Sequence, residues 1–171
     1  MENLTRRIAK VSDKSDRYAL FLVLSSIYER LRSVTHNTAG LAIKAGGGVL
    51  VKTGAAACNF SAGGSLGTIA AATDMPALVG TVSNAAFNVF VFSVDSAGNT
   101  LTTMGTEGAA LANVKFPAIA DDQAILGYIT INPTGTGDFV GGTTALDDAT
   151  VVPNAVYVNT VGAVSPVAPI V

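Results

Sequence analysis

The stretch Phe87-Asn-Val-Phe-Val-Phe-Ser-Val94 decides the fold. In an extended chain, successive side chains point to opposite faces. One face of this segment carries Phe87, Val89 and Val91, and the other carries Phe90, Phe92 and Val94. Apolar residues on both faces are typical of a strand that is buried on two sides. The segment therefore predicts the central strand of a β structure.

The residues after this strand predict a hairpin. Asp95-Ser-Ala-Gly-Asn99 has the composition of a turn, in which Gly98 is free to adopt a positive φ. Thr100–Thr106 then alternates between apolar and polar residues, as expected of a half-buried strand. We therefore expect residues 87–106 to form an antiparallel β-hairpin.

Other short apolar segments, separated by Gly, Ser or Pro, predict further strands. They are Leu41–Lys44, Gly48–Thr53, Gly67–Ala71, Ala77–Val82, Ala124–Asn132 (stopped by Pro133), Thr150–Val152 and Ala155–Asn159. Short strands at this spacing favour a sandwich or barrel, and no strand–helix alternation suggests a parallel α/β sheet. We predict a mainly β fold, an antiparallel and jelly-roll-like sandwich or barrel with an N-terminal helical arm.

A change in composition marks the arm. Residues 1–36 hold seven Lys/Arg and four acids, for a net charge of +3, whereas residues 37–171 hold three Lys and eight acids, for a net charge of −5. All 18 Gly and all six Pro lie in the second part. We therefore predict a helical arm over 1–36, a β domain over 37–164 and an extended tail over 165–171.

The arm carries a heptad-like stripe. Its apolar residues recur at spacings of 4, 3, 4 and 3: Leu20, Leu24, Ile27, Leu31 and Val34. Ser12 or Ser15 is a candidate N-cap, with Asp16 in the first turn. A shorter stripe of Leu4, Ile8 and Val11 precedes them, and residues 12–15 are expected to break or kink the helix between the two stripes.

The stripe leaves three roles open for the arm: packing on its own domain, self-association, and docking on another protein. It covers only about two heptads, fewer than a stable coiled coil needs. Burial of Leu20, Leu24, Ile27 and Leu31 would contribute roughly 6–12 kcal/mol per chain. Association entropy costs roughly 4–15 kcal/mol. These four candidate interface residues would thus assist an oligomer without holding it alone.

Composition excludes several classes of protein. Hydrophobic residues make up 49% of the 171 residues and the net charge is −2, which argues against a disordered chain. One Cys and one His support neither a disulfide scaffold nor a zinc module. The apolar run Tyr18–Leu24 is far shorter than the ~20 residues of a membrane span. No secretion signal is evident, so we expect synthesis in the cytoplasm and no membrane partner.

Residues with chemical potential have simpler structural interpretations. His36 lies where the arm meets the β domain, a poor place for a catalytic base, and Cys58 lies in an apolar stretch that predicts burial. The pairs Asp121-Asp122 and Asp147-Asp148 are expected in turns, because adjacent strand residues point apart; a Ca²⁺ site or acid–base catalysis is the weaker alternative. We predict no catalytic residue, no metal and no cofactor.

Two further features have a structural interpretation and not a functional one. Gly46–Gly48 and Gly63-Gly64 lack the Lys-Ser/Thr of a phosphate-binding loop and are expected in turns. Acidic residues interleave with the basic residues of the arm, so the sequence shows no nucleic-acid-binding footprint.

The apolar tail Ser165–Val171 is expected either to be frayed or to lie as an added strand on a neighbouring subunit.

Residues 85–148 resemble a segment of small virion proteins of tailed bacteriophages. The resemblance lies in an aromatic strand with an Ala-Gly turn and a Gly-Thr-Glu ending (Phe90–Glu107), a hydrophobic Pro segment (Val114–Ala118), an Ile/Leu-Gly-Tyr strand (Ile125–Ile131) and a Phe-x-x-Gly-Thr-Thr-x-Leu-Asp-like element (Phe139–Asp148). It covers roughly 65 of the 171 residues, and the arm lies outside it.

This resemblance implies a non-enzymatic structural protein: a capsid decoration, cement or head-fibre subunit, usually a β-rich homotrimer, located in the virion with the major capsid protein or other virion proteins as partners. The alternative is a receptor- or glycan-binding module of a tail fibre, for which Tyr128 and Tyr157 are the candidate aromatic residues, although both are predicted in strands. A small hydrolase that uses the Asp pairs is a further alternative.

Overall fold

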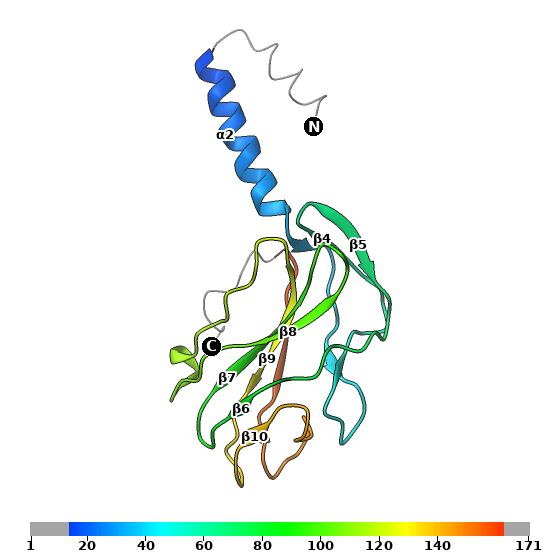
Figure 1. Cartoon of the computed structure of the whole chain (residues 1–171), viewed down its shortest axis with the longest axis vertical. Coiled ribbons are helices and arrows are strands. Elements are labelled where there is room, and N and C mark those ends of the chain that lie inside the picture. Colours follow the sequence, from blue (N-terminus) through cyan, green and yellow to red (C-terminus); the bar gives the residue numbers. More distant parts are fainter. Residues whose placement is uncertain (1–13, 163–171) are drawn as a thin grey trace.

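A single helix stands on a mainly antiparallel β body in the computed structural model, which describes residues 14–162 (Figure 1). Helix α2 spans Lys14–Leu31, and every named strand pair that follows is antiparallel. The predicted fold class is thereby confirmed, with a sandwich-like arrangement. The predictions for Leu4, Ile8 and Val11, for a cap at Ser12 and for the tail 165–171 fall outside the described residues.

The central sheet has four strands in the order β11-β9-β7-β8. They are β7 (Asn88–Val94), β8 (Thr100–Met104), β9 (Ala124–Ile131) and β11 (Val156–Asn159). The hairpin predicted from the sequence is β7–β8, in which Phe90 pairs with Met104 and Val94 pairs with Thr100. Strand β9 then pairs with the other edge of β7, so β7 has a partner on each side.

The turn of this hairpin is held by the side chain of Asp95. Its Oδ1 accepts hydrogen bonds from the backbone N–H groups of Ala97 and Asn99, at 2.9 and 2.8 Å, and its Oδ2 accepts one from the Asn99 amide. Gly98 adopts φ 86°, as the turn requires. The hydrogen bonds, those from Asn99 above all, hold the pKa of the Asp95 carboxyl below its ordinary value.

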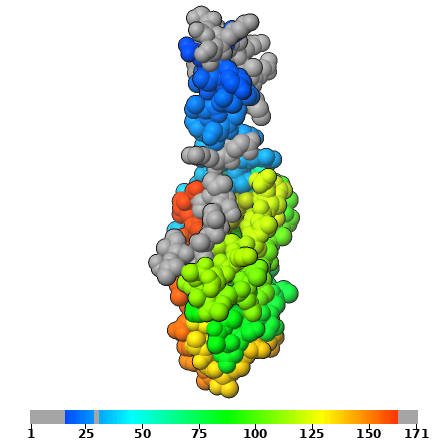
Figure 2. Space-filling model, turned by 90° about the vertical axis from the view of Figure 1, so that its left-hand side faces the viewer, coloured from blue at the N-terminus to red at the C-terminus, as the bar shows by residue number. Residues whose placement is uncertain are grey.

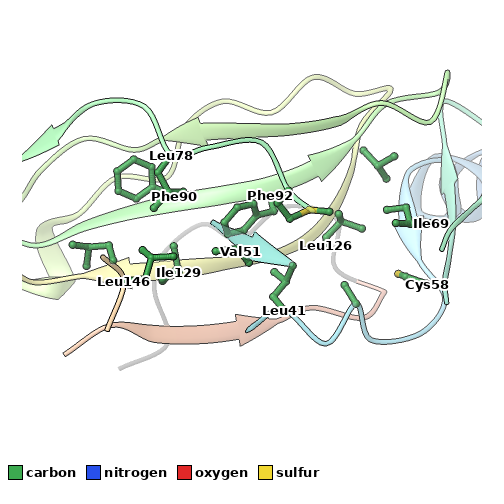
Figure 3. Packing of buried hydrophobic residues seen from close by; sticks show 14 of the residues in the cluster. Leu41, Val51, Cys58, Ile69, Leu78, Phe90, Phe92, Leu126, Ile129 and Leu146 are labelled. Carbon is green, nitrogen blue, oxygen red and sulfur yellow. The ribbon is translucent and has the colours of Figure 1, made fainter. Parts of the chain in front are cut away.

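Strand β7 is buried on both faces along its whole length, as predicted. Phe90 and Phe92 enter the larger core (Figure 3), and so does Val94. The Phe90 ring packs edge-on against Phe139, with 6.0 Å between ring centres. Val89 and Val91 enter a second, smaller core on the other face of the sheet. Each face therefore has its own apolar cover.

Short sheets cover the larger core. One has the order β1-β4-β5, formed by Val34–Thr35, Cys58–Ala62 and Ser65–Ile69; two more are the pairs β2-β3 (Ala42–Ile43, Val51–Lys52) and β6-β10 (Thr81–Val82, Phe139–Val140). Their buried members include Val51, Phe60 and Val82. The smaller core is covered by a loop that includes the 3₁₀ turn Leu111–Asn113 and the partly buried Phe116.

Several local predictions were wrong. Thr150–Val152 is a turn and not a strand, because the amides of Val151 and Val152 both bond back to the carbonyl of Asp148. Val34, the last residue of the apolar stripe, is buried in β1 and does not belong to the helix. Ser15 lies inside the helix and is not its N-cap. Strands β1, β4 and β10 were not predicted.

The hairpin β4–β5 explains the glycine pair at 63–64. Ala62 pairs with Ser65, so only Gly63 and Gly64 form the loop, and both have positive φ, 57° and 84°. Two-residue hairpin loops of this kind need positive φ at both positions, which glycine adopts without strain. The interpretation of this pair as a turn is confirmed, and the same holds for Gly46–Gly48, where Gly48 bonds back to Ala45.

The two cores predict a matched pair of substitutions. Leu126 is fully buried and Leu66 is 82% exposed. We expect Leu126→Ala to lower the free energy of unfolding by about 2–5 kcal/mol, because it leaves a cavity. Leu66→Ala is expected to change it by less than about 0.5 kcal/mol. Urea denaturation of both variants measures the difference; equal losses would contradict the assignment of the core.

Candidate functional site

The helix α2 presents apolar side chains that no other part of residues 14–162 covers. Leu20, Phe21, Val23, Ile27, Tyr28 and Leu31 are between 37% and 57% exposed, and Leu24 is partly buried. Figures 1 and 2 show the reason: the helix projects from the end of the β body near β4 and β5 and stands clear of it. Packing of the arm on its own domain, one of the three roles open from the sequence, is therefore contradicted.

The apolar face of the helix is wider than the predicted stripe. At about 100° per residue, the side chains from Leu20 to Leu31 can be placed around the helix axis. Seven of them follow one another over about 160°: Val23, Ile27, Leu20, Leu31, Leu24, Tyr28 and Phe21. We call these seven residues the arm face. The predicted site residues Leu20, Leu24, Ile27 and Leu31 form its centre.

Sequence reasoning missed the flanks of the arm face, which are Phe21, Val23 and Tyr28. The signal was present, since a projection of residues 20–31 onto a helical wheel places these three beside the stripe. The spacing of 4 and 3 alone selects a narrower strip. Leu22 is also exposed, but it points to the opposite side of the helix.

The root of the helix is tied firmly to the β body. The Gly64 amide donates to the Arg32 carbonyl at 2.8 Å, and the Gly63 amide donates to Ser33 Oγ at 3.1 Å. The Ser33 hydroxyl in turn donates to the Asp121 carbonyl. Strand β1 begins one residue later and pairs with β4. The direction of the helix is thereby set by hydrogen bonds on both sides of its exit.

A close approach at Gly64 adds to this anchorage. A Cβ at Gly64 would lie 3.1 Å from the hydroxyl of Tyr28, so a side chain at this position would require the Tyr28 ring to shift by a few tenths of an ångström. The glycine therefore serves both the hairpin loop and the contact with the arm. The arm thus leaves the β body from a base that hydrogen bonds at Arg32 and Ser33 hold to the β4–β5 loop.

The energetics of the arm face favour burial in an assembly. Roughly half of each of these side chains is still accessible to water. Covering them would stabilise a complex by about 5–10 kcal/mol per chain. Association entropy costs about 4–15 kcal/mol. The face is thus large enough to contribute most of what an assembly requires, with a further contribution from the β body.

Length and apolarity decide whether a helix can cross a bilayer. Among residues 14–162, no helix combines the length and the apolarity that a bilayer crossing demands.

His36 makes a specific structural contact that the sequence did not indicate. Its Nε2 lies 2.7 Å from the hydroxyl of Ser61 across the β1–β4 pair, and its backbone amide donates to Asn59. Ser61 is buried, so its hydroxyl is shielded from solvent on a strand that pairs on both edges. The contact joins β4 to the segment after the arm, and this accounts for the position of both side chains.

Cys58 is buried, as predicted. Its Sγ donates to the Asn37 carbonyl at 3.4 Å. Burial raises the pKa of the thiol above its ordinary value. A protonated thiol without solvent access is a poor nucleophile, so this cysteine acts as a core residue.

The acidic pairs organise loops. Asp147 accepts the Gly47 amide on both carboxylate oxygens at 3.0 Å, and Asp148 accepts the amide and hydroxyl of Thr150, which lowers its pKa. Asp121 accepts Ser33 through its backbone. Within the described residues, no set of three His, Cys, Asp or Glu side chains is grouped closely enough to ligate a metal ion.

The two tyrosines proposed for a glycan platform lie in strands, as predicted, but they differ in access. Tyr128 in β9 is buried in the smaller core, edge-on to Phe116 at 5.0 Å, and offers no platform. Tyr157 in β11 lines an open groove of about 330 Å³ together with Ile43, Leu146, Asp147, Val152 and Pro153. Burial, with the negative charge of Asp147, raises the pKa of Tyr157 to about 12.

Comparison with known proteins gives no relative. No family model, curated protein or solved structure matches this chain. The arm face and its anchorage are therefore interpreted on their own geometry.

The environment of Tyr157 predicts a pH dependence at alkaline pH. Its pKa is raised from the ordinary 10.0 to about 12, so the folded state holds the phenol proton more tightly than the unfolded state does. The resulting stabilisation is complete below pH 10 and is lost as the pH rises to about 12. We expect Tyr157→Phe to lose less stability than the parent chain over this interval. Thermal unfolding at a series of pH values measures it; parallel curves would contradict the environment described for Tyr157.

Proposed function

We propose that this chain is a structural protein of a tailed-bacteriophage virion, a capsid decoration, cement or head-fibre subunit that acts as a homotrimer and has no enzymatic activity. The observation that carries the proposal is the arm face: an apolar helix held rigidly away from a β body, which a chain acting alone would leave in water. Exposed apolar faces of this size mark surfaces for protein association.

The β body supports the same role. The stretch that resembles phage virion proteins, residues 85–148, contains three of the four strands of the central sheet, β7, β8 and β9, together with β10. The resemblance therefore falls on a part of the chain that contributes residues to both cores. In this arrangement, the β body is displayed outward, and the arm meets the neighbouring copies or the shell beneath.

The alternative, a receptor- or glycan-binding module, has weaker support. A glycan platform needs exposed aromatic rings, and Tyr128 is 2% exposed. Tyr157 is the remaining candidate, and its hydroxyl is buried without a hydrogen-bond partner in the described part of the chain. A glycan array with tight and specific binding, lost in Tyr157→Ala, would favour this alternative.

The proposal predicts that the protein is part of the particle surface. In virions purified from an infection by the phage that encodes it, we expect mass spectrometry to detect this chain and antibodies against its β body to label intact heads. Virions that lack it should lose a surface feature or withstand heat or low salt less well, because a layer of contacts on the shell is missing. Purified virions without any copy of this chain would refute the proposal.

An antibody against an internal virion protein is the matched control. It should label disrupted particles only, whereas the antibody against this chain labels intact ones. Labelling of disrupted particles alone by both antibodies would place the protein inside the head and contradict a decorating role.

A further inference from the structure

The residue types along the arm face define a heptad register. With Leu24 at position a, Ile27 falls at d and Leu31 at the next a, and Leu20 occupies the preceding d. Leucine at a combined with isoleucine at d shifts the preference of parallel helices from dimers toward trimers and tetramers. Leu24, Ile27 and Leu31 therefore favour a bundle of more than two helices, whereas Leu20 at the other d position and Arg17 at the first a position do not share this pattern.

From this register, we propose that the arm face is covered by the arms of other copies of this chain, in a parallel bundle of at least three helices. The inference deepens the assembly part of the proposed function and rests on it, but it does not depend on the location of the protein in a virion. It assigns the contact between copies to α2 and not to the sheets alone.

The flanks of the arm face support a bundle over a pair. Phe21 and Tyr28 occupy e positions and Val23 occupies a g position, where two-stranded coiled coils commonly carry charged residues. In a pair, these three side chains would stay in water beside a narrow a/d seam. In a ring, each helix contacts two neighbours, so a face of about 160° is covered on both flanks.

The size and charge of the face fit a second copy. Seven half-accessible side chains expose on the order of 600 Å², close to the roughly 800 Å² that each partner buries in a standard protein interface. Residues 14–31 contain three basic and two acidic residues, a net charge of only +1, so repulsion between identical helices is concentrated at Arg17, whose a position brings its copies together. The helix carries no large excess of charge with which a strongly charged partner could pair.

The anchorage at the helix root sets where the β bodies lie in a bundle of either polarity. The hydrogen bonds from Gly63 and Gly64 hold every copy of α2 in the same direction relative to its own β body. Parallel helices place the β bodies side by side at one end of the bundle. Antiparallel helices would place β bodies at both ends, where the root of one helix would meet the free end of its partner.

The test compares two substitutions in the full chain. Ile27 on the arm face is 47% exposed and Leu22 on the opposite side is 49% exposed, so both can change without loss of a buried contact in one chain. Light scattering of the parent chain should give at least three times the mass of one chain. Ile27→Glu should raise the dissociation constant at least about 100-fold and give single chains at micromolar concentration, whereas Leu22→Glu should leave the mass unchanged.

Each outcome decides the inference. A monomeric or dimeric parent chain, or an Ile27→Glu variant that keeps the parent mass, overturns it. An oligomer that survives Ile27→Glu would place the contact between β bodies and leave the proposed virion role intact. Absence of the protein from virions, in contrast, would end the virion role and leave the bundle standing. Unchanged thermal unfolding of the β body in Ile27→Glu excludes misfolding as the cause.

A cysteine variant tests the polarity. Arg17 occupies an a position near the free end of the described helix, so Arg17→Cys places thiols of parallel copies next to one another. Two Cα atoms within about 7 Å can form a disulfide, and mild oxidation should give disulfide-linked dimers on a non-reducing gel. Leu22→Cys, which points outward, should link far less. Equal linking of both variants would contradict the parallel bundle.

Discussion

Burial of strand β7 on both of its faces is the constraint from which the rest of the structure follows. A strand with apolar side chains on two sides needs a layer against each of them, and 171 residues supply little regular structure for this purpose. The chain uses three short sheets for one face and an irregular loop with Val114 and Phe116 for the other. Within residues 14–162, these covering segments lie over β7, and the apolar side chains of the arm helix stay exposed.

The parts of the fold that sequence could predict are those with strong local signals. The apolar composition of Phe87–Val94 predicts its burial, and the composition of Asp95–Asn99 predicts the turn. Strand β9 ends close to Pro133, as expected. The charge change near residue 37 separates the helical arm from the Gly-rich part. Cys58 was correctly expected to be buried because its neighbours are small and apolar.

The missed elements depend on partners that are distant in the sequence. Strands β1 and β10 are two residues long and exist only through pairing, with residues 60–61 and 81–82 respectively. Val34 fits the helical stripe by its spacing, but it pairs with β4 and therefore belongs to the sheet. The centre of the arm face was predicted from the spacing of its apolar residues. Its flanks can be found only by projecting the sequence onto a helical wheel. Its exposure depends on where the β body lies, and no local sequence pattern contains that information.

The buried thiol has a practical consequence for the chemical labelling of this protein. Cys58 is the only cysteine of the chain, it is inaccessible to solvent, and it remains protonated at neutral pH. A protein with no reactive thiol on its surface can be stored in air without oxidative cross-linking. A maleimide dye would therefore react only with a cysteine introduced by mutation, so a fluorophore can be attached at one chosen point of each chain.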